Sequence, residues 1–157
     1  MSYLKAKHLS DLLVSKGLTI SVAESCTGGS LSSSLTSISG ASSYFNCGFI
    51  TYSNQSKIDM LGVSPESIEM YGAVSEKVAH EMVVGADQKS HSNLAVSITG
   101  IAGPSGGSAA KPVGMVCIGF FFDGEVTTTT QFFSGSRSDI VSQSNAYALV
   151  ELSSQLS

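Results

Sequence analysis

Two kinds of segment alternate along this chain. In one kind the apolar residues recur with the period of a helix, and in the other they recur with the two-residue period of a strand. Helices are expected over residues 3–15, around 31–38, after the start signals at Asn54, Ser64 and Ser75, and over 136–156. Strands are expected over residues 18–23, 44–52, 94–99, 114–122 and 126–133. This alternation is typical of an α/β fold in which helices cover a sheet.

The last two expected strands are separated by Asp123-Gly124, which is the strongest hairpin signal in the chain. Helices that alternate with strands, together with one hairpin, predict an α/β fold with a mixed β-sheet flanked by helices on both faces. No linker, repeat or change in composition divides the chain. A single domain over residues 1–157 is therefore expected.

The charged residues argue against some classes of partner. Twelve acidic residues outnumber eight basic ones, and the basic residues are scattered along the chain. A nucleic-acid-binding surface usually carries a basic stripe, so no nucleic-acid partner is expected. The sequence has neither an apolar leader nor an apolar run long enough to cross a bilayer, so we expect a cytoplasmic protein with no membrane partner.

The three cysteines, Cys26, Cys47 and Cys117, cannot all pair with one another, and they show no CxxC or Cys/His spacing. The histidines are isolated as well. This pattern favours reduced thiols over disulfides or zinc ligands. Neither a metal nor another cofactor is expected.

The segment Ala23-Glu24-Ser25-Cys26-Thr27-Gly28-Gly29 lies where a strand ends and a helix begins. Its two glycines allow close approach of the backbone, and N–H groups at a helix start can bind an anion or stabilise a developing oxyanion. This arrangement suits the nucleophile of an acyl transfer. An ordinary capped helix with a tight turn is the alternative, and the segment is neither a GxSxG elbow nor a P-loop.

Two side chains of this junction are candidate nucleophiles. Cys26 is intrinsically the better one, but it needs a base such as histidine, and none stands in a recognisable motif. Ser25 also needs a base, and a lysine can serve if burial or nearby cations lower its pKa. Lys57 is placed for this role in the first turn of the helix after Tyr52, at the positive end of the helix dipole. A solvated surface lysine is the alternative.

Two further segments are suited to holding a ligand. Residues 99–107 contain four glycines directly after an expected strand, so their backbone can wrap a phosphate or a sugar. Arg137, the only arginine, follows Ser136 in the first turn of the last helix, where a cation is unfavourable unless an anion shares the site. A mere turn and a surface arginine are the respective alternatives.

Five motifs occur in an order that resembles one known family. They are Ala23–Gly29, Tyr52-Ser53-Asn54 with Lys57, Gly72-Ala73-Val74-Ser75-Glu76, Thr99–Pro104 and Lys111-Pro112-Val113-Gly114. Together they resemble the C-terminal domain of the competence/damage-inducible protein CinA, which is also found alone as nicotinamide-nucleotide amidase. The resemblance covers roughly residues 5–155. It implies a helix-flanked mixed sheet, hydrolysis of the carboxamide of nicotinamide mononucleotide to nicotinate mononucleotide and ammonia, and no metal.

The resemblance also implies roles for individual residues. Ser25 is expected to be the nucleophile, Lys57 its base, and Tyr52 a neighbour that orients the pair. Backbone N–H groups near Gly28 and Gly29, or in the 100–107 loop, are expected to hold the oxyanion. The expected substrate contacts are Thr27, Gly28, Gly29, Thr99, Gly100, Gly103 and Arg137.

The chain departs from the family pattern at Ser136, where the family has an aspartate before the arginine. If that acid holds Arg137 or contacts substrate, its loss would slow the reaction or alter its specificity, although a serine can also cap the helix. Two other functions remain open: a non-catalytic nucleotide-binding or regulatory module, and an amidohydrolase that uses Cys26. The run Phe120-Phe121-Phe122 indicates either the partner surface of a homo-oligomer or an inner position in the sheet.

Overall fold

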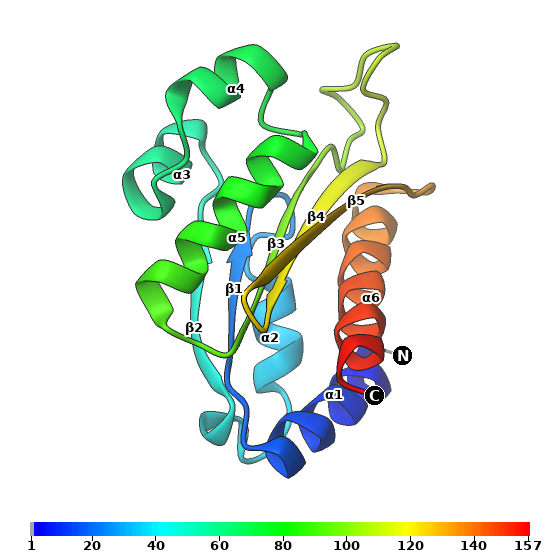
Figure 1. The fold of residues 1–157 in the computed structure, drawn as a ribbon. Helices are drawn as coiled ribbons and strands as arrows, with labels where there is room; N and C mark the ends of the chain where they lie inside the picture. Colours follow the sequence, from blue (N-terminus) through cyan, green and yellow to red (C-terminus); the bar gives the residue numbers. More distant parts are fainter. Residues whose placement is uncertain (1) are drawn as a thin grey trace.

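The computed structural model describes residues 2–157 and contains a five-stranded sheet with helices on both faces (Figure 1). The helices are α1 (Ser2–Lys16), α2 (Ser30–Thr36), α3 (Asn54–Leu61), α4 (Pro65–Tyr71), α5 (Glu76–Ser90) and α6 (Arg137–Leu156), with a 3-10 helix at Ala41–Ser43. The strands are β1 (Ile20–Glu24), β2 (Phe45–Ile50), β3 (Leu94–Gly100), β4 (Met115–Phe122) and β5 (Glu125–Phe132).

The strand order is β2-β1-β3-β4-β5, and the sheet is mixed, as predicted. β1 runs parallel to both β2 and β3, whereas β4 is antiparallel to β3 and to β5. The carboxyl ends of the three parallel strands therefore meet at one edge, where Glu24 pairs with Ile50 on one side and with Ile98 on the other. Ligands of α/β proteins usually bind at this edge.

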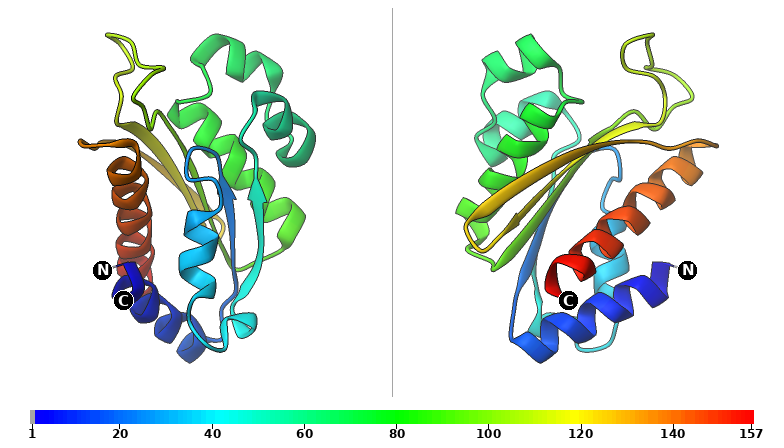
Figure 2. Two further views of the ribbon diagram at one scale, coloured as in Figure 1. Left: turned by 180° about the vertical axis from the view of Figure 1, so that it is seen from behind. Right: turned by 45° about the vertical axis from the view of Figure 1, so that its right-hand side comes forward.

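Helices α1, α2 and α6 cover one face of the sheet, and α3, α4 and α5 lie on the other (Figures 1 and 2). The core of the first face includes Leu9, Leu31 and Leu149, and that of the second includes Val78 and Met82. β1 is buried along its whole length because it lies between the two cores. Among residues 2–157 no helix combines the length and the apolarity needed to cross a membrane.

The hairpin prediction is confirmed in detail, because Asp123 and Gly124 both have positive φ, at 54° and 78°, as a type I′ turn requires. The predicted cap of α3 is wrong by one residue. Ser53, not Asn54, caps this helix, with its hydroxyl accepting from the N–H of Ser56 at 3.1 Å. The predicted strand ends are one or two residues too long in several places, which is where tertiary contacts outweigh local pattern.

The run Phe120–Phe122 lies in β4, between β3 and β5. Phe120 is buried in the core beneath α6. Of the two interpretations offered by the sequence, the inner position in the sheet is therefore the right one for this run. A homo-oligomer stays a prediction.

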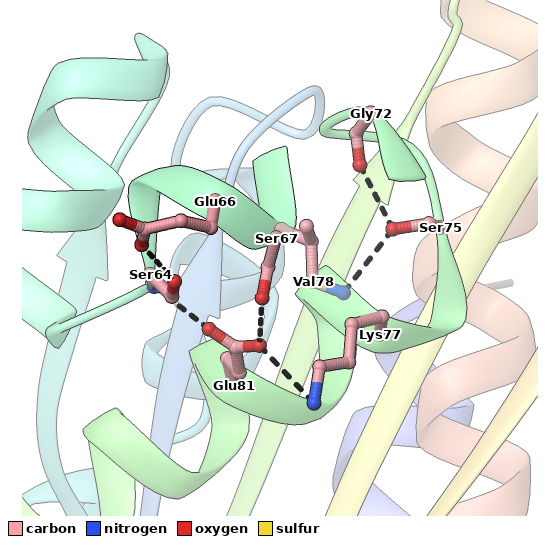
Figure 3. A network of polar contacts seen from close by, with 8 residues as sticks. All are labelled: Ser64, Glu66, Ser67, Gly72, Ser75, Lys77, Val78 and Glu81. Carbon is pink, nitrogen blue, oxygen red and sulfur yellow. Dashed lines mark hydrogen bonds and ion pairs between the residues drawn. The ribbon is translucent and has the colours of Figure 1, made fainter. Parts of the chain in front are cut away.

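A carboxylate of α5 fixes the start of α4 (Figure 3). Glu81 accepts from the N–H of Ser64 at 2.7 Å and from the hydroxyl of Ser67 at 2.5 Å. The hydroxyl of Ser64 itself bonds to Glu66 and does not cap the helix. Glu81 therefore takes over part of the capping role and ties the layer of α3, α4 and α5 together.

Candidate active site

The predicted nucleophile and base lie at the edge of the sheet where the three parallel strands end. Ser25 directly follows β1, and its N–H donates to the carbonyl of Ile98 on β3 at 3.0 Å. The chain after β2 is held to the same place, because the N–H of Thr51 donates to the carbonyl of Glu24 at 2.8 Å. Helix α3 begins shortly afterwards and carries Lys57 back toward β1.

Glu24, the last residue of β1, is fully buried and fixes the turn that follows Ser25. One carboxylate oxygen accepts from the N–H groups of Gly29 and Leu31, at 3.1 and 3.0 Å. The other accepts from the N–H and the hydroxyl of Ser32, at 2.9 and 2.6 Å. Glu24 thus occupies the donors at the start of α2 that an external anion would otherwise use. This role of Glu24 was not predicted, although an acid at the end of an apolar strand was a signal for it.

Ser25 and Lys57 form a hydrogen-bonded pair, which we call the dyad, with 3.0 Å between Oγ and Nζ. The two residues are only 8% and 1% exposed, so the alternative of a surface lysine is wrong. Nζ also lies 2.9 Å from the carbonyl oxygen of Thr51 and 3.4 Å from that of Tyr52. Nζ lies 3.5 Å from the carbonyl oxygen of Ser53 as well. When the amine is neutral, it keeps two N–H bonds for these carbonyls, and its lone pair can accept the serine proton.

Burial lowers the pKa of Lys57, because the ammonium ion loses its hydration inside the protein. The nearby Cys26 raises that pKa to a smaller extent. Within residues 2–157 no carboxylate forms an ion pair with Lys57. The fraction of neutral amine at a given pH therefore exceeds that of a surface lysine, which is what a general base requires.

Cys26 lies beside the dyad, but its thiol is poorly suited to attack. Burial is the main cause that raises its pKa to about 11, and the charge of Glu24 acts in the same direction. All three cysteines are free thiols, as expected. Among residues 2–157 no group of three His, Cys, Asp or Glu side chains is placed to hold a metal ion.

Arg137, at the start of α6, connects two other parts of the site. Its guanidinium group donates to the carbonyl of Gly103 and to the hydroxyl of Tyr52, both at 2.6 Å. The hydroxyl of Tyr52 therefore points to Arg137 and not to the dyad, so the predicted orienting role is not supported for this hydroxyl. Only the backbone carbonyl of Tyr52 lies close to Lys57.

Ser136, the residue that departs from the motif, starts α6 with a capping box. Its hydroxyl accepts from the N–H of Asp139 at 3.2 Å, and the carboxylate of Asp139 accepts from the N–H of Ser136 at 2.9 Å. The serine therefore preserves the helix start that positions Arg137.

Thr99 and the loop after β3 form another wall of the site. Thr99 is buried, and its hydroxyl donates to the carbonyl of Ala73 at 2.9 Å. Gly100 ends β3, and a Cβ there would lie 2.7 Å from a methyl group of Val116, so this position requires glycine. The wall thus consists of backbone that approaches its neighbours closely.

A cavity of about 260 Å³ joins these parts of the site. The predicted site residues that line it are Ser25, Tyr52, Lys57, Thr99, Gly100, Gly103 and Arg137. Thr27, Gly28 and Gly29 do not line it, so the cavity gives no support to their predicted contact with substrate. Besides Cys26 and further residues of the 99–107 loop, the cavity is lined by Asn54, Ala73 and Val74, for which no role was predicted. A larger cavity of about 500 Å³ between β5 and α6 contains none of the predicted residues.

The backbone donors near Ser25 differ from those expected for the oxyanion. The N–H of Gly28 already donates to the carbonyl of Ser25 at 3.1 Å, and that of Gly29 donates to Glu24. The N–H groups of Cys26 and Thr27 donate to no backbone carbonyl among residues 2–157. Of these two residues, Cys26 lines the cavity beside Ser25 and Thr27 does not.

Comparisons with known proteins agree with this fold. The family model of the CinA C-terminal domain matches residues 3–156. A putative competence-damage inducible protein of Alkaliphilus oremlandii is 50% identical over 138 residues, which are 88% of this chain and 33% of that protein. The nicotinamide-nucleotide amidohydrolase PncC of Enterobacter agglomerans is 49% identical over 138 residues, which are 87% of this chain and 84% of that protein.

A solved structure extends the comparison to three dimensions. The crystal structure of a competence or damage-inducible protein from Enterobacter asburiae matches with a TM-score of 0.96 at 34% identity. The match covers 100% of this chain and 99% of that one. The chain therefore spans about a third of the longer Alkaliphilus relative and most of the two enterobacterial proteins.

Proposed function

This chain belongs to the CinA C-terminal domain family, and we propose that it is a nicotinamide-nucleotide amidohydrolase that acts through the Ser25–Lys57 dyad. The observation that carries the proposal is the buried hydrogen bond between Ser25 and Lys57. Burying an amine without an acidic partner costs stability, and a nucleotide-binding or regulatory module would have no use for one against a serine. The name of the Enterobacter agglomerans relative supports the same reaction.

The first half of the proposed reaction forms an ester on Ser25. The neutral amine of Lys57 takes the hydroxyl proton while the serine oxygen attacks the carboxamide carbon of nicotinamide mononucleotide. The resulting ammonium then delivers this proton to the amide nitrogen. The carbon–nitrogen bond breaks, ammonia leaves, and Lys57 is neutral again.

The second half hydrolyses the ester by the same route. Lys57 takes a proton from a water molecule that attacks the ester carbon, and it returns the proton to the departing oxygen of Ser25. The product is nicotinate mononucleotide. No step of this scheme calls on a metal ion or a cofactor.

The proposed oxyanion site consists of the backbone N–H groups of Cys26 and Thr27. They are the two donors that directly follow the nucleophile, and neither donates to a backbone carbonyl within residues 2–157. Donors that are fixed before the reaction stabilise the charge that develops on the carboxamide oxygen. Glu24 supports this arrangement because it holds the rest of the turn in place.

We assign the phosphate of the substrate to Arg137 and the glycine loop. The guanidinium now bonds to two neutral oxygens, those of Gly103 and Tyr52, and an anion is a stronger partner for it. The phosphate should therefore matter for substrate choice.

A comparison of nicotinamide mononucleotide with nicotinamide riboside, which lacks the phosphate, tests this function. We expect kcat/KM to be about 100-fold higher for the mononucleotide, because charged hydrogen bonds are lost with the phosphate. Arg137→Met is expected to remove most of this difference by lowering only the value for the mononucleotide. Equal values for the two substrates, or an equal loss on both in the variant, would contradict the assignment.

Cys26→Ala is expected to keep kcat/KM within about threefold of the wild type. With a pKa of about 11, four units above neutrality, only about one thiol in ten thousand is ionised at pH 7. Steady-state rates of ammonia release check this prediction. An inactive Cys26→Ala variant beside an active Ser25→Ala variant would favour the cysteine amidohydrolase instead.

We further propose that the chain acts as one domain, in the cytoplasm, on a small-molecule substrate. The match of the family model to residues 3–156 supports the first point. The shortage of basic residues gives no support to a nucleic-acid partner.

A further inference from the structure

Lys111 reaches from the loop between β3 and β4 to the segment that joins α4 to α5. Its Nζ donates to the carbonyl oxygens of Tyr71 and Val74, the second at 2.8 Å. Tyr71 is the last residue of α4, so its carbonyl has no partner within that helix. One ammonium group thus joins two loops that lie about forty residues apart in the sequence.

The two carbonyls between these positions are also held by side chains. That of Gly72 accepts from the hydroxyl of Ser75 at 2.8 Å (Figure 3), and that of Ala73 accepts from Thr99 at 2.9 Å. Gly72 has a φ of 81°, and a Cβ there would lie 2.7 Å from Nζ of Lys111. The segment therefore follows a fixed path, and the positive φ at Gly72 favours glycine beside the lysine.

The loop that carries Lys111 also shapes the opposite wall. Val113 packs so closely on the glycine loop that a Cβ on Gly103 would overlap with its side chain. The carbonyl of Gly103 in turn accepts from Arg137 at 2.6 Å. A displacement of the loop would thus reach the guanidinium group as well.

Both connected segments line the cavity that contains the dyad, one with Ala73 and Val74, the other with Gly100–Gly103, Ser105 and Gly106. Lys111 itself does not line this cavity and touches neither member of the dyad. We infer that Lys111 is a positioning residue that holds the two walls at the spacing that the substrate requires. The inference takes the identity of the substrate from the proposed function, whereas the contact between the walls does not depend on that function.

The kinetic test compares Lys111→Met with Lys77→Met, a matched lysine on α5 whose side chain is 52% exposed. We expect Lys111→Met to raise KM for nicotinamide mononucleotide about tenfold and to leave kcat within about threefold of the wild type, because substrate binding and not acyl transfer depends on the walls. Lys77→Met should change neither constant. Lys111→Arg keeps a cationic donor and should recover much of the lost binding.

Amide hydrogen exchange without substrate makes the test independent of the reaction. Peptides that cover residues 71–75 and 101–113 should exchange faster in Lys111→Met than in the wild type or in Lys77→Met. If the wild type turns over nicotinamide mononucleotide, the inference requires both the rise in KM and the faster exchange. Either change alone, or a fall in kcat at constant KM, then overturns it. If the wild type hydrolyses no nicotinamide nucleotide, the proposed function fails, and the exchange result alone decides the role of Lys111. If Lys111→Met does not fold, Lys111→Arg decides, because it must then show the same two changes in weaker form.

Discussion

Ser25→Ala is expected to lower kcat for nicotinamide mononucleotide by about 10³-fold or more, with little change in substrate binding. The hydroxyl is the only group in the proposed scheme that forms a bond to the substrate, so no other side chain can replace it. The fold should survive, because Ser25 is held by its backbone N–H and its side chain bonds only to Lys57. Steady-state kinetics, with isothermal binding of the substrate to the inactive variant, measure both expectations.

Ser37→Ala is a matched control for this variant. Ser37 is exposed just after α2, and its hydroxyl bonds only to a carbonyl of the same helix. The Ser37→Ala variant should therefore hydrolyse nicotinamide mononucleotide at the wild-type rate. A Ser25→Ala protein that keeps more than about a tenth of the wild-type kcat would exclude serine as the nucleophile.

Lys57→Met is expected to lower kcat by about 10³-fold, which is within the range that a lost general base costs. Methionine is chosen because it nearly fills the buried space and cannot accept a proton. The wild type should show a rate that rises with pH and levels off above the pKa of Lys57, which burial places below its ordinary value of 10.5. The residual rate of the variant should lack this rise. A wild-type profile that is flat from mildly acidic to alkaline pH would contradict lysine as the base.

The same pKa shift makes folding depend on pH, with a sign that can be checked. Because the folded state binds the proton of Lys57 less tightly than the unfolded state does, protonation favours unfolding. The free energy of unfolding of the wild type should therefore increase relative to that of Lys57→Met as pH rises from the lowered pKa toward 10.5. Denaturant titrations at several pH values measure this difference without any substrate.

The fold was largely predictable because its signals are local. Apolar periodicity indicated the helices and strands, and Asp123-Gly124 identified the one hairpin. The meeting of Ser25 with Lys57 was also within reach, since the carboxyl ends of neighbouring parallel strands lie at one edge of a sheet. What local pattern did not give was the strand order, which sets β1 between β2 and β3.

Several functional contacts were not predictable because they depend on side chains that cross between distant elements. Arg137 was expected to meet an anion, and it bonds to the neutral oxygens of Tyr52 and Gly103. The partners of Lys111 lie some forty residues away, beyond any periodic signal.

Hydrolysis of the carboxamide is tested most directly by incubating nicotinamide mononucleotide with the purified wild-type chain in water enriched in oxygen-18 and analysing the products. One ammonia and one nicotinate mononucleotide are expected for each substrate consumed, with one heavy oxygen in the new carboxylate, because water completes the hydrolysis. A chain that binds the nucleotide but releases no ammonia at any pH from about 6 to 10 would contradict it.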